Sequence, residues 1–234
     1  MKKKLIGIIG ALEIEVEGLK AVLTSPETVE HGGMKFTVGE LGLQKVVVVK
    51  SGMGKVFAGI CAQTMIDVFA PDLIINTGIA GALRDDVGIL DVVIAKRTLQ
   101  HDVDSSPIGD PVGLVSGLPD IYLPCDEEAA EKIAAAARSL GVNCLIGTTA
   151  SGDTFVADKE KMEWIRSFFG ADACDMEGGA IGQVCVFRNV PYCVLRTMSD
   201  GGNEDAEMDY PKFAKLAANQ SIRIVRAFAE SLAE

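Results

Sequence analysis

The stretch "YCVLRTMSDGG", residues 192–202, decides how this chain folds and where its chemistry lies. It begins inside the apolar run "PYCVL", which is typical of a strand buried on both faces of a sheet. It then carries Arg196 and Asp200 before two glycines, Gly201 and Gly202, which would let the chain turn away. Ligands bind beyond the carboxyl ends of the strands in open α/β sheets, so this charged strand end predicts a functional site.

Short apolar runs and helical patterns alternate along the rest of the chain, which predicts an α/β fold. The 234 residues, 48% hydrophobic and without a compositional break, predict a single domain over 1–234. We expect three layers, with a mixed, mostly parallel central sheet flanked by helices. The expected strands are 5–9, 45–50, 73–76, 91–94 and 192–198, with two more near 35 and 147, and the expected helices are 13–23, 56–69, 127–140, 159–168, 178–187 and 210–232.

Charge and cysteine content exclude several classes of partner. The net charge of −11 and the isoelectric point near 4.7 argue against nucleic acid and anionic membrane surfaces, and favour a small uncharged or cationic ligand. Six cysteines without a C-x-x-C pair, beside only two histidines, predict free thiols in a reducing compartment and no metal site. No segment approaches membrane-spanning length, so we expect a cytoplasmic protein.

Glu15 is a carboxylate within an apolar stripe. In the expected first helix it shares one face with Leu12, Leu19 and Val22, whereas Glu13 lies on another face. Either the helix begins late and leaves Glu15 exposed in the preceding turn, or Glu15 is aimed into a cavity.

Glu177 and Asp200 raise the same question elsewhere. Glu177 opens a helix that is apolar almost all round, so it is either a capping or salt-bridging residue or a carboxylate that binds a ligand. Asp200 either initiates a turn or caps a helix, or it belongs to a site. Arg196 is either a structural ion-pair partner or part of that site. A buried guanidinium requires carboxylates nearby, and the candidates are Glu15 and Glu177.

Glycine-rich turns follow several expected strands and would let backbone N–H groups approach a ligand. No G-x-G-x-x-G follows the first strand and no G-x-x-x-x-G-K-[ST] is present, so neither familiar form of nucleotide-phosphate binding is supported. The chain also carries, in this order, the motifs "IGIIGALEIEVE", "KSGMGKV", "PDLIINTGIAGAL", "HDVD", "SGDTFV", "CDMEGGAIGQVC" and "VLRTMSDGG". In their order and spacing, these motifs resemble those of the 5′-methylthioadenosine/S-adenosylhomocysteine nucleosidases of the purine nucleoside phosphorylase-like superfamily.

The resemblance implies hydrolysis of the N-glycosidic bond of an adenosine-type nucleoside by water, with no metal or organic cofactor. Glu15 would hold and activate the water, Arg196 would lie near both, and Asp200 would be the general acid at the purine. Glu177 would bind the ribose hydroxyls. The other substrate-binding residues would be Met53, Ala80, Gly81, Phe155, Val156, Met176, Ser199 and Tyr210, with Phe155 stacked on the base. The family fold has a twisted sheet and is usually a homodimer in which a loop of one subunit lines the pocket of the other.

Chemistry gives independent support for these roles. Cleavage builds positive charge on the sugar and negative charge on the purine, so a proton delivered to N7 by a neutral Asp200 lowers the barrier, while Glu15 has to stay ionised. A protonated aspartate offers one donor and one acceptor, which complement N7 and the 6-amino group of adenine.

Phosphorolysis is the rival reaction. The glutamates at the first strand end would repel phosphate, whereas Lys55 and Arg84 leave that reaction open.

The 5′ substituent stays open. Ile79 and Ala82 depart from the residues that the family often has, and the loop after "HDVD", over 105–119, lacks the aromatic residues that cover the 5′ group in relatives. Tyr210 could supply part of that cover. The substituent could be methylthio, homocysteinyl, a bare deoxy carbon or the side chain of 6-amino-6-deoxyfutalosine.

A hypothesis from another class is a non-catalytic nucleoside-binding protein, although binding alone would not need a buried acid and base together. The irregular stretch over 100–124 is expected to be either a lid or an intersubunit contact.

Overall fold

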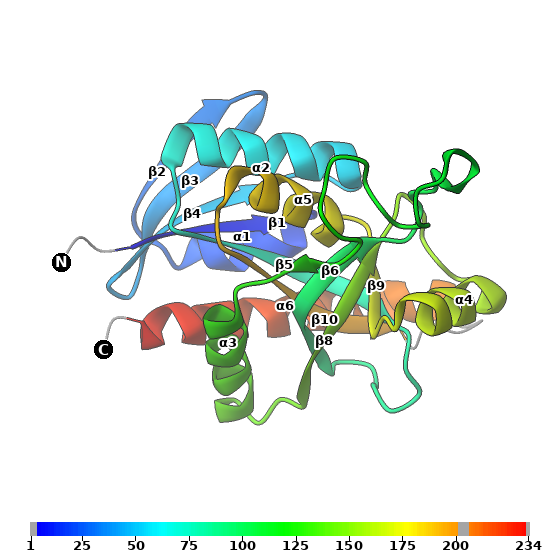
Figure 1. Ribbon diagram of the computed structural model, residues 1–234. Helices are drawn as coiled ribbons and strands as arrows, with labels where there is room; N and C mark the ends of the chain where they lie inside the picture. Colours follow the sequence, from blue (N-terminus) through cyan, green and yellow to red (C-terminus); the bar gives the residue numbers. More distant parts are fainter. Residues whose placement is uncertain (1–3, 201–205, 233–234) are drawn as a thin grey trace.

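Parallel strands form the centre of the molecule (Figure 1). The computed structural model describes residues 4–200 and 206–232. In it, β1 (Leu5–Gly10) lies between β4 (Gln44–Lys50) and β5 (Leu73–Ala82), and β10 (Tyr192–Asp200) lies along β5, all four in parallel. Their isoleucines and valines are almost entirely buried, because helices cover the sheet on both faces.

Antiparallel strands extend this centre, so the sheet is mixed. On one side β2 (Thr24–His31), β3 (Met34–Leu41) and β4 form a meander. On the other, β6 (Val92–Gln100) runs antiparallel to β10 and to β7 (Leu123–Pro124) and parallel to β8 (Cys144–Ser151). The neighbour of β8, β9 (Ala173–Asp175), runs antiparallel to β5. The expected α/β fold with a mixed sheet flanked by helices is confirmed, with antiparallel pairs as frequent as parallel ones among the described strands.

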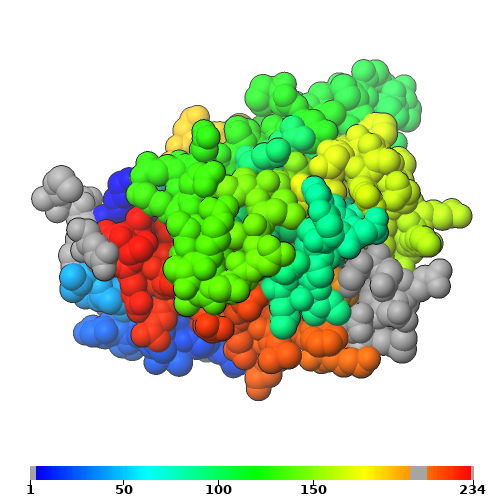
Figure 2. Space-filling view, turned by 90° about the horizontal axis from the view of Figure 1, so that it is seen from below, coloured from blue at the N-terminus to red at the C-terminus, as the bar shows by residue number. Residues whose placement is uncertain are grey.

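Helices form a layer on each face of the sheet. On the face that presents Ile8 lie α1 (Glu13–Ala21), α3 (Glu127–Ser139) and α6 (Ala206–Ser231). On the opposite face, which presents Ile9, lie α2 (Lys55–Phe69) and α5 (Gly178–Arg188). α4 (Lys159–Phe169) packs against the ends of β6 and β8 in a smaller core. Figure 2 looks onto the first face and shows α6 beside α3.

Several boundaries differ from the expected ones. β5, β6 and β10 continue beyond their apolar runs, because backbone pairing persists through polar residues, in β10 through Arg196 and Asp200. β2 has no counterpart among the expected strands, since its side chains are mostly exposed and include Pro26, which leaves no apolar period. Between β6 and β7 the irregular stretch contains the short 3₁₀ turn Ser106–Ile108. Gly201 and Gly202 lie outside the described residues.

None of the helices within the described part of the chain is both long enough and apolar enough to cross a membrane. The prediction of one domain over 1–234 stays a prediction.

The start of α5 packs directly on the backbone of β6. A methyl group on Gly179 would lie 2.5 Å from the Leu99 carbonyl oxygen, whereas one on Gly59, within α2, would meet only the Val184 side chain at 3.9 Å. We therefore expect Gly179→Ala to lower the free energy of unfolding by about 1–3 kcal/mol through overpacking. Gly59→Ala should be neutral or stabilise by up to about 1 kcal/mol through helix propensity.

Urea denaturation of both variants measures this difference. Equal midpoints for the two alanine variants would contradict the close packing of α5 on β6.

Candidate active site

A cavity opens at the carboxyl ends of β1, β5, β9 and β10, as the topology of an open α/β sheet predicts. Together with its mouth it has about 680 Å³ of empty space. All but one of the site residues expected from the sequence line it: Glu15, Met53, Ala80, Gly81, Phe155, Val156, Met176, Glu177, Ser199, Asp200 and Tyr210. The exception is Arg196, which is fully buried behind the cavity wall.

Glu15 lies in the first turn of α1 and is 2% exposed. The N–H groups of Ala11 and Leu12 donate to its Oε2 at 2.7 and 2.8 Å, and that of Ile79 donates to its Oε1 at 3.1 Å. Burial raises the pKa of Glu15, while Arg196 and these N–H donors oppose the rise. The alternative in which the helix begins late and exposes Glu15 is ruled out. The carboxylate is held in one orientation, and its raised pKa makes its ionised form a stronger base.

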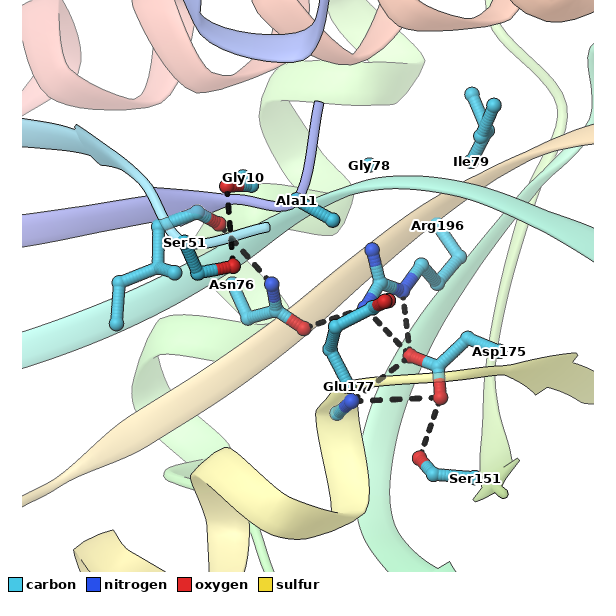
Figure 3. Close-up of polar contacts among 12 residues, drawn as sticks. Gly10, Ala11, Ser51, Asn76, Gly78, Ile79, Ser151, Asp175, Glu177 and Arg196 are labelled. Atoms are coloured by element: carbon cyan, nitrogen blue, oxygen red, sulfur yellow. Dashed lines mark hydrogen bonds and ion pairs between the residues drawn. The ribbon is translucent and has the colours of Figure 1, made fainter. Parts of the chain in front are cut away.

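Arg196 lies at the centre of a buried polar cluster (Figure 3). Its Nε and Nη2 contact Oδ2 of Asp175 at 2.6 and 2.5 Å, and Nη2 donates to Oδ1 of Asn76 at 2.5 Å. The Ser151 hydroxyl donates to Oδ1 of the same aspartate, and the Gly178 N–H donates to Oδ2 at 3.1 Å.

Asp175, the bonded partner of this guanidinium, is not among the partners expected from the sequence. Of the two expected partners, Glu177 lies 3.6 Å from Nη2, and Glu15 bonds to backbone N–H groups instead. Asp175 ends the three-residue strand β9, in register with Ser151 of β8, and that pairing directs its side chain inward. A strand so short carries no periodic signal in the sequence.

One nitrogen of Arg196 remains available to a ligand. Nη1 is buried and has no hydrogen-bond partner among the described residues. A side chain on Gly78 would collide both with this nitrogen and with Oε1 of Glu15, so the two groups face the same point above the Gly78 backbone. A buried N–H without a partner is costly, so a water or substrate oxygen at that point would be bound favourably.

Glu177 is the N-cap residue of α5, directly before Gly178, and it is held by a neighbouring loop. The Gly54 N–H donates to its Oε1 at 2.9 Å. Burial raises the pKa of Glu177 to about 7, against the opposing charge of Arg196.

An ion pair fastens that loop to two others. Lys55 Nζ lies 2.6 Å from Oδ1 of Asp102, which follows β6, and the Lys55 N–H donates to Asp153, which follows β8, at 2.7 Å. The Asp153 N–H in turn donates to Asp102 at 2.9 Å. Three strand ends are thereby joined at the rim of the cavity, and Lys55 is paired outside it.

Asp200 is the last residue of β10, beside the carboxyl end of β5, and it is 3% exposed. The Ser199 hydroxyl contacts its Oδ2 at 3.0 Å. Gly81 pairs with it across the two strands, and a methyl group on Gly81 would lie 2.9 Å from Oδ1, so the glycine permits this close approach. Phe155 and Tyr210 stand nearby in an edge-to-face pair, with ring centroids 5.7 Å apart.

Among the described residues, no group of three or more histidine, cysteine, aspartate or glutamate side chains is arranged to hold a metal ion. The cavity brings together four buried carboxyl groups, those of Glu15, Asp175, Glu177 and Asp200, and the guanidinium of Arg196 lies behind them. Such a set can move protons on and off a bound neutral molecule.

The buried ion pair predicts a large effect on stability. Arg196→Met removes the cation and leaves the Asp175 carboxylate buried without its partner, which should lower the free energy of unfolding by about 3–5 kcal/mol. The matched control is Arg226→Met, which breaks the exposed i,i+4 pair with Glu230 and should cost less than about 1 kcal/mol. Thermal or urea unfolding compares them, and similar losses in both variants would contradict the central role of Arg196.

Comparisons with known proteins identify the family. The model of the phosphorylase superfamily matches residues 5–230. The chain is 38% identical to the 5′-methylthioadenosine/S-adenosylhomocysteine nucleosidase of Shewanella pealeana over 229 residues, which are 97% of this chain and 99% of the relative. The crystal structure of the corresponding Neisseria meningitidis nucleosidase in complex with methylthio-immucillin-A has a TM-score of 0.94 and 35% identity, over 97% of this chain and 99% of that one. The futalosine hydrolase of Helicobacter pylori has a TM-score of 0.93 and 31% identity, over 97% and 98%. The chain therefore belongs to the 5′-methylthioadenosine/S-adenosylhomocysteine nucleosidase family of the phosphorylase superfamily, as its motifs predict.

Proposed function

We propose that this chain hydrolyses the N-glycosidic bond of 5′-substituted adenosines, among them 5′-methylthioadenosine, S-adenosylhomocysteine and 5′-deoxyadenosine. The products are adenine and the 5′-substituted ribose. The observation that carries the proposal is that buried Glu15 and the unpartnered Nη1 of Arg196 face the same point above Gly78. Farther along β5, the strand that holds Gly78, buried Asp200 lies beside Gly81. Membership of the nucleosidase family supports it.

Glu15 is the proposed base for the attacking water. Its carboxylate is fixed by three N–H donors, and a raised pKa makes its ionised form a better proton acceptor than an exposed glutamate. Nη1 of Arg196 can donate to the same water and direct its oxygen towards the sugar carbon. Glu177, with Oε1 held by Gly54, has its second oxygen to accept from a ribose hydroxyl.

Asp200 is the proposed acid at the purine. Gly78 and Gly81, which mark the positions of Glu15 and Asp200 along β5, are three residues apart, roughly 10 Å. That separation suits a water at the sugar and a proton donor at N7 of the same nucleoside. Phe155 offers a face for stacking on adenine, and the Val156 backbone lies beside it to bind the base edge. Ala80, Met176 and Ser199 complete the proposed walls around base and ribose.

Water is the proposed nucleophile rather than phosphate. No lysine or arginine among the described residues lines the cavity. Lys55 is paired with Asp102, and Arg84 is paired with Asp86 at 2.7 Å and Asp172 at 3.1 Å. An anionic nucleophile next to Glu15 would therefore meet repulsion, and Arg196, the cation that faces this point, is already paired with Asp175. Hydrolysis of 6-amino-6-deoxyfutalosine, the same bond with a larger 5′ group, is the second candidate, supported by the open mouth beside half-exposed Met53 and by the likeness to a futalosine hydrolase.

A homodimer in the cytoplasm is the proposed form of the enzyme. An apolar surface formed by Met53, Val56, Phe57 and Ile60 of α2 and its preceding turn is more than 45% exposed at each residue and continues into the cavity mouth. Patches of this kind mark interfaces between protein chains. A second copy would cover this surface and bring its 105–119 loop near the mouth. The six cysteines are free thiols, which suits a reducing compartment.

The catalytic roles predict losses of turnover without loss of fold. Adenine release from 5′-methylthioadenosine should proceed equally with and without phosphate, and Glu15→Gln and Asp200→Asn should each lower kcat at least about 100-fold. Glu13→Gln, on the exposed face of the same helix, is the control for Glu15 and should keep full activity. An absolute need for phosphate, or full turnover by Glu15→Gln, would overturn the mechanism.

Light scattering after size exclusion tests the dimer. The wild-type chain should elute at twice the mass of one chain, and Phe57→Glu should shift it towards the monomer and raise KM, because the mouth loses its cover. A wild-type monomer with full activity would contradict the shared cavity.

A further inference from the structure

A chain of hydrogen bonds connects the interior of α6 with Glu15. Thr197 Oγ1 on β10 lies 2.8 Å from Ser221 Oγ on α6, and Ser221 Oγ donates to the Gly78 carbonyl oxygen at 3.1 Å. The N–H of Ile79, which belongs to the same peptide group as that carbonyl, donates to Oε1 of Glu15 at 3.1 Å. Thr197 and Ser221 are fully buried, and neither lines the cavity.

The direction of every proton in this chain is determined. A carbonyl oxygen only accepts, so the single hydroxyl proton of Ser221 points to Gly78. Thr197 therefore donates to Ser221. The donors all point towards Glu15, and in such a series each hydrogen bond polarises the next one. The peptide N–H that reaches Glu15 is accordingly a stronger donor than an isolated N–H.

The Gly78–Ile79 peptide is also the tightest point of the proposed site. No side chain fits on Gly78, because it would collide with Arg196 and Glu15. Gly78 therefore has no side chain that could fix the orientation of this peptide. The Ser221 hydroxyl donates to its carbonyl oxygen, while its N–H points the opposite way and donates to Glu15.

We propose that Ser221, with Thr197 behind it, is a positioning residue for Glu15: its hydroxyl fixes and polarises the peptide whose N–H orients the carboxylate of the base. This inference rests on the proposed function of Glu15. Ser221 touches no substrate, so its removal should affect kcat rather than KM.

The charged groups around Glu15 determine what its titration reports. Arg196 on β10 favours the ionised form, while Glu177 at the start of α5 disfavours it. Other titratable groups of the cavity wall are Asp175 on β9, Asp200 on β10 and Tyr210 on α6, which is neutral below its raised pKa. None of these groups changes in Ser221→Ala. A weaker Ile79 donor stabilises the carboxylate less, so the pKa of Glu15 should rise further in that variant, and the acidic limb of the kcat/KM profile should move to higher pH.

Ser221→Ala in the full-length chain tests the inference with 5′-methylthioadenosine as substrate. We expect kcat to fall roughly three- to tenfold, KM to change less than about twofold, and the acidic limb to rise by roughly 0.3–1 pH unit. Thr197→Val should shift both quantities in the same direction by less, and Thr197→Ser, which keeps the hydroxyl, should restore them. Ser231→Ala is the control, since Ser231 on the same helix donates to the Phe228 carbonyl at 2.7 Å, far from Glu15.

A readout without turnover separates this inference from the proposed function. Infrared or carbon-13 titration of the Glu15 carboxyl in the free protein should show the same upward shift in Ser221→Ala and Thr197→Val. If the wild-type chain releases no adenine, the proposed function fails while this titration still tests the hydrogen-bond chain. Folded Ser221→Ala and Thr197→Val variants with an unmoved Glu15 titration would overturn the inference.

Discussion

The buried guanidinium of Arg196 is the group on which the rest of the site depends. A cation without exposure to solvent is tolerated only where carboxylates and amide oxygens surround it. Its partners come from separate elements: Asn76 from β5, Asp175 from β9 and Glu177 from the start of α5. Satisfying one charge therefore fixes the relative positions of β10, β5 and the turn from β9 to α5, and these three segments form much of the cavity wall.

An excess of buried acid over buried base follows from this arrangement. Glu15, Asp175, Glu177 and Asp200 line a cavity with one guanidinium behind it. Burial raises the pKa of Glu15 and of Glu177, and Arg196 with the backbone N–H donors limits that rise. Such surroundings repel anions and favour a neutral acid beside an ionised base. Cleavage of a glycosidic bond by water needs both of these forms, whereas phosphorolysis needs the cations that are paired elsewhere.

The sequence predicted the site residues that interrupt an apolar helix or strand pattern. It did not predict residues whose local sequence shows no such interruption. Glu15 stands out because it interrupts an apolar helix face, and Arg196 and Asp200 stand out because they end an apolar strand. Asp175 ends a strand too short for a periodic signal, and nothing in the local sequence of β2 marks its exposed residues as a strand. Ser221 looks like an ordinary helical serine, and its contact with Gly78 spans 143 residues. Contacts of that kind arise from tertiary packing, which one sequence does not encode in any local pattern.

α6 links two properties of the site that the sequence presents as separate. Tyr210 near its beginning lines the cavity beside Phe155, and Ser221 farther along holds the peptide that orients Glu15. Both residues lie on one continuous helix that packs along β10 and β5. A displacement of the helix that moved the Tyr210 wall would also strain the bond to Gly78. Because both contacts belong to one element, the proposed cover of the cavity and the orientation of the proposed base depend on the same packing of α6 against β10 and β5.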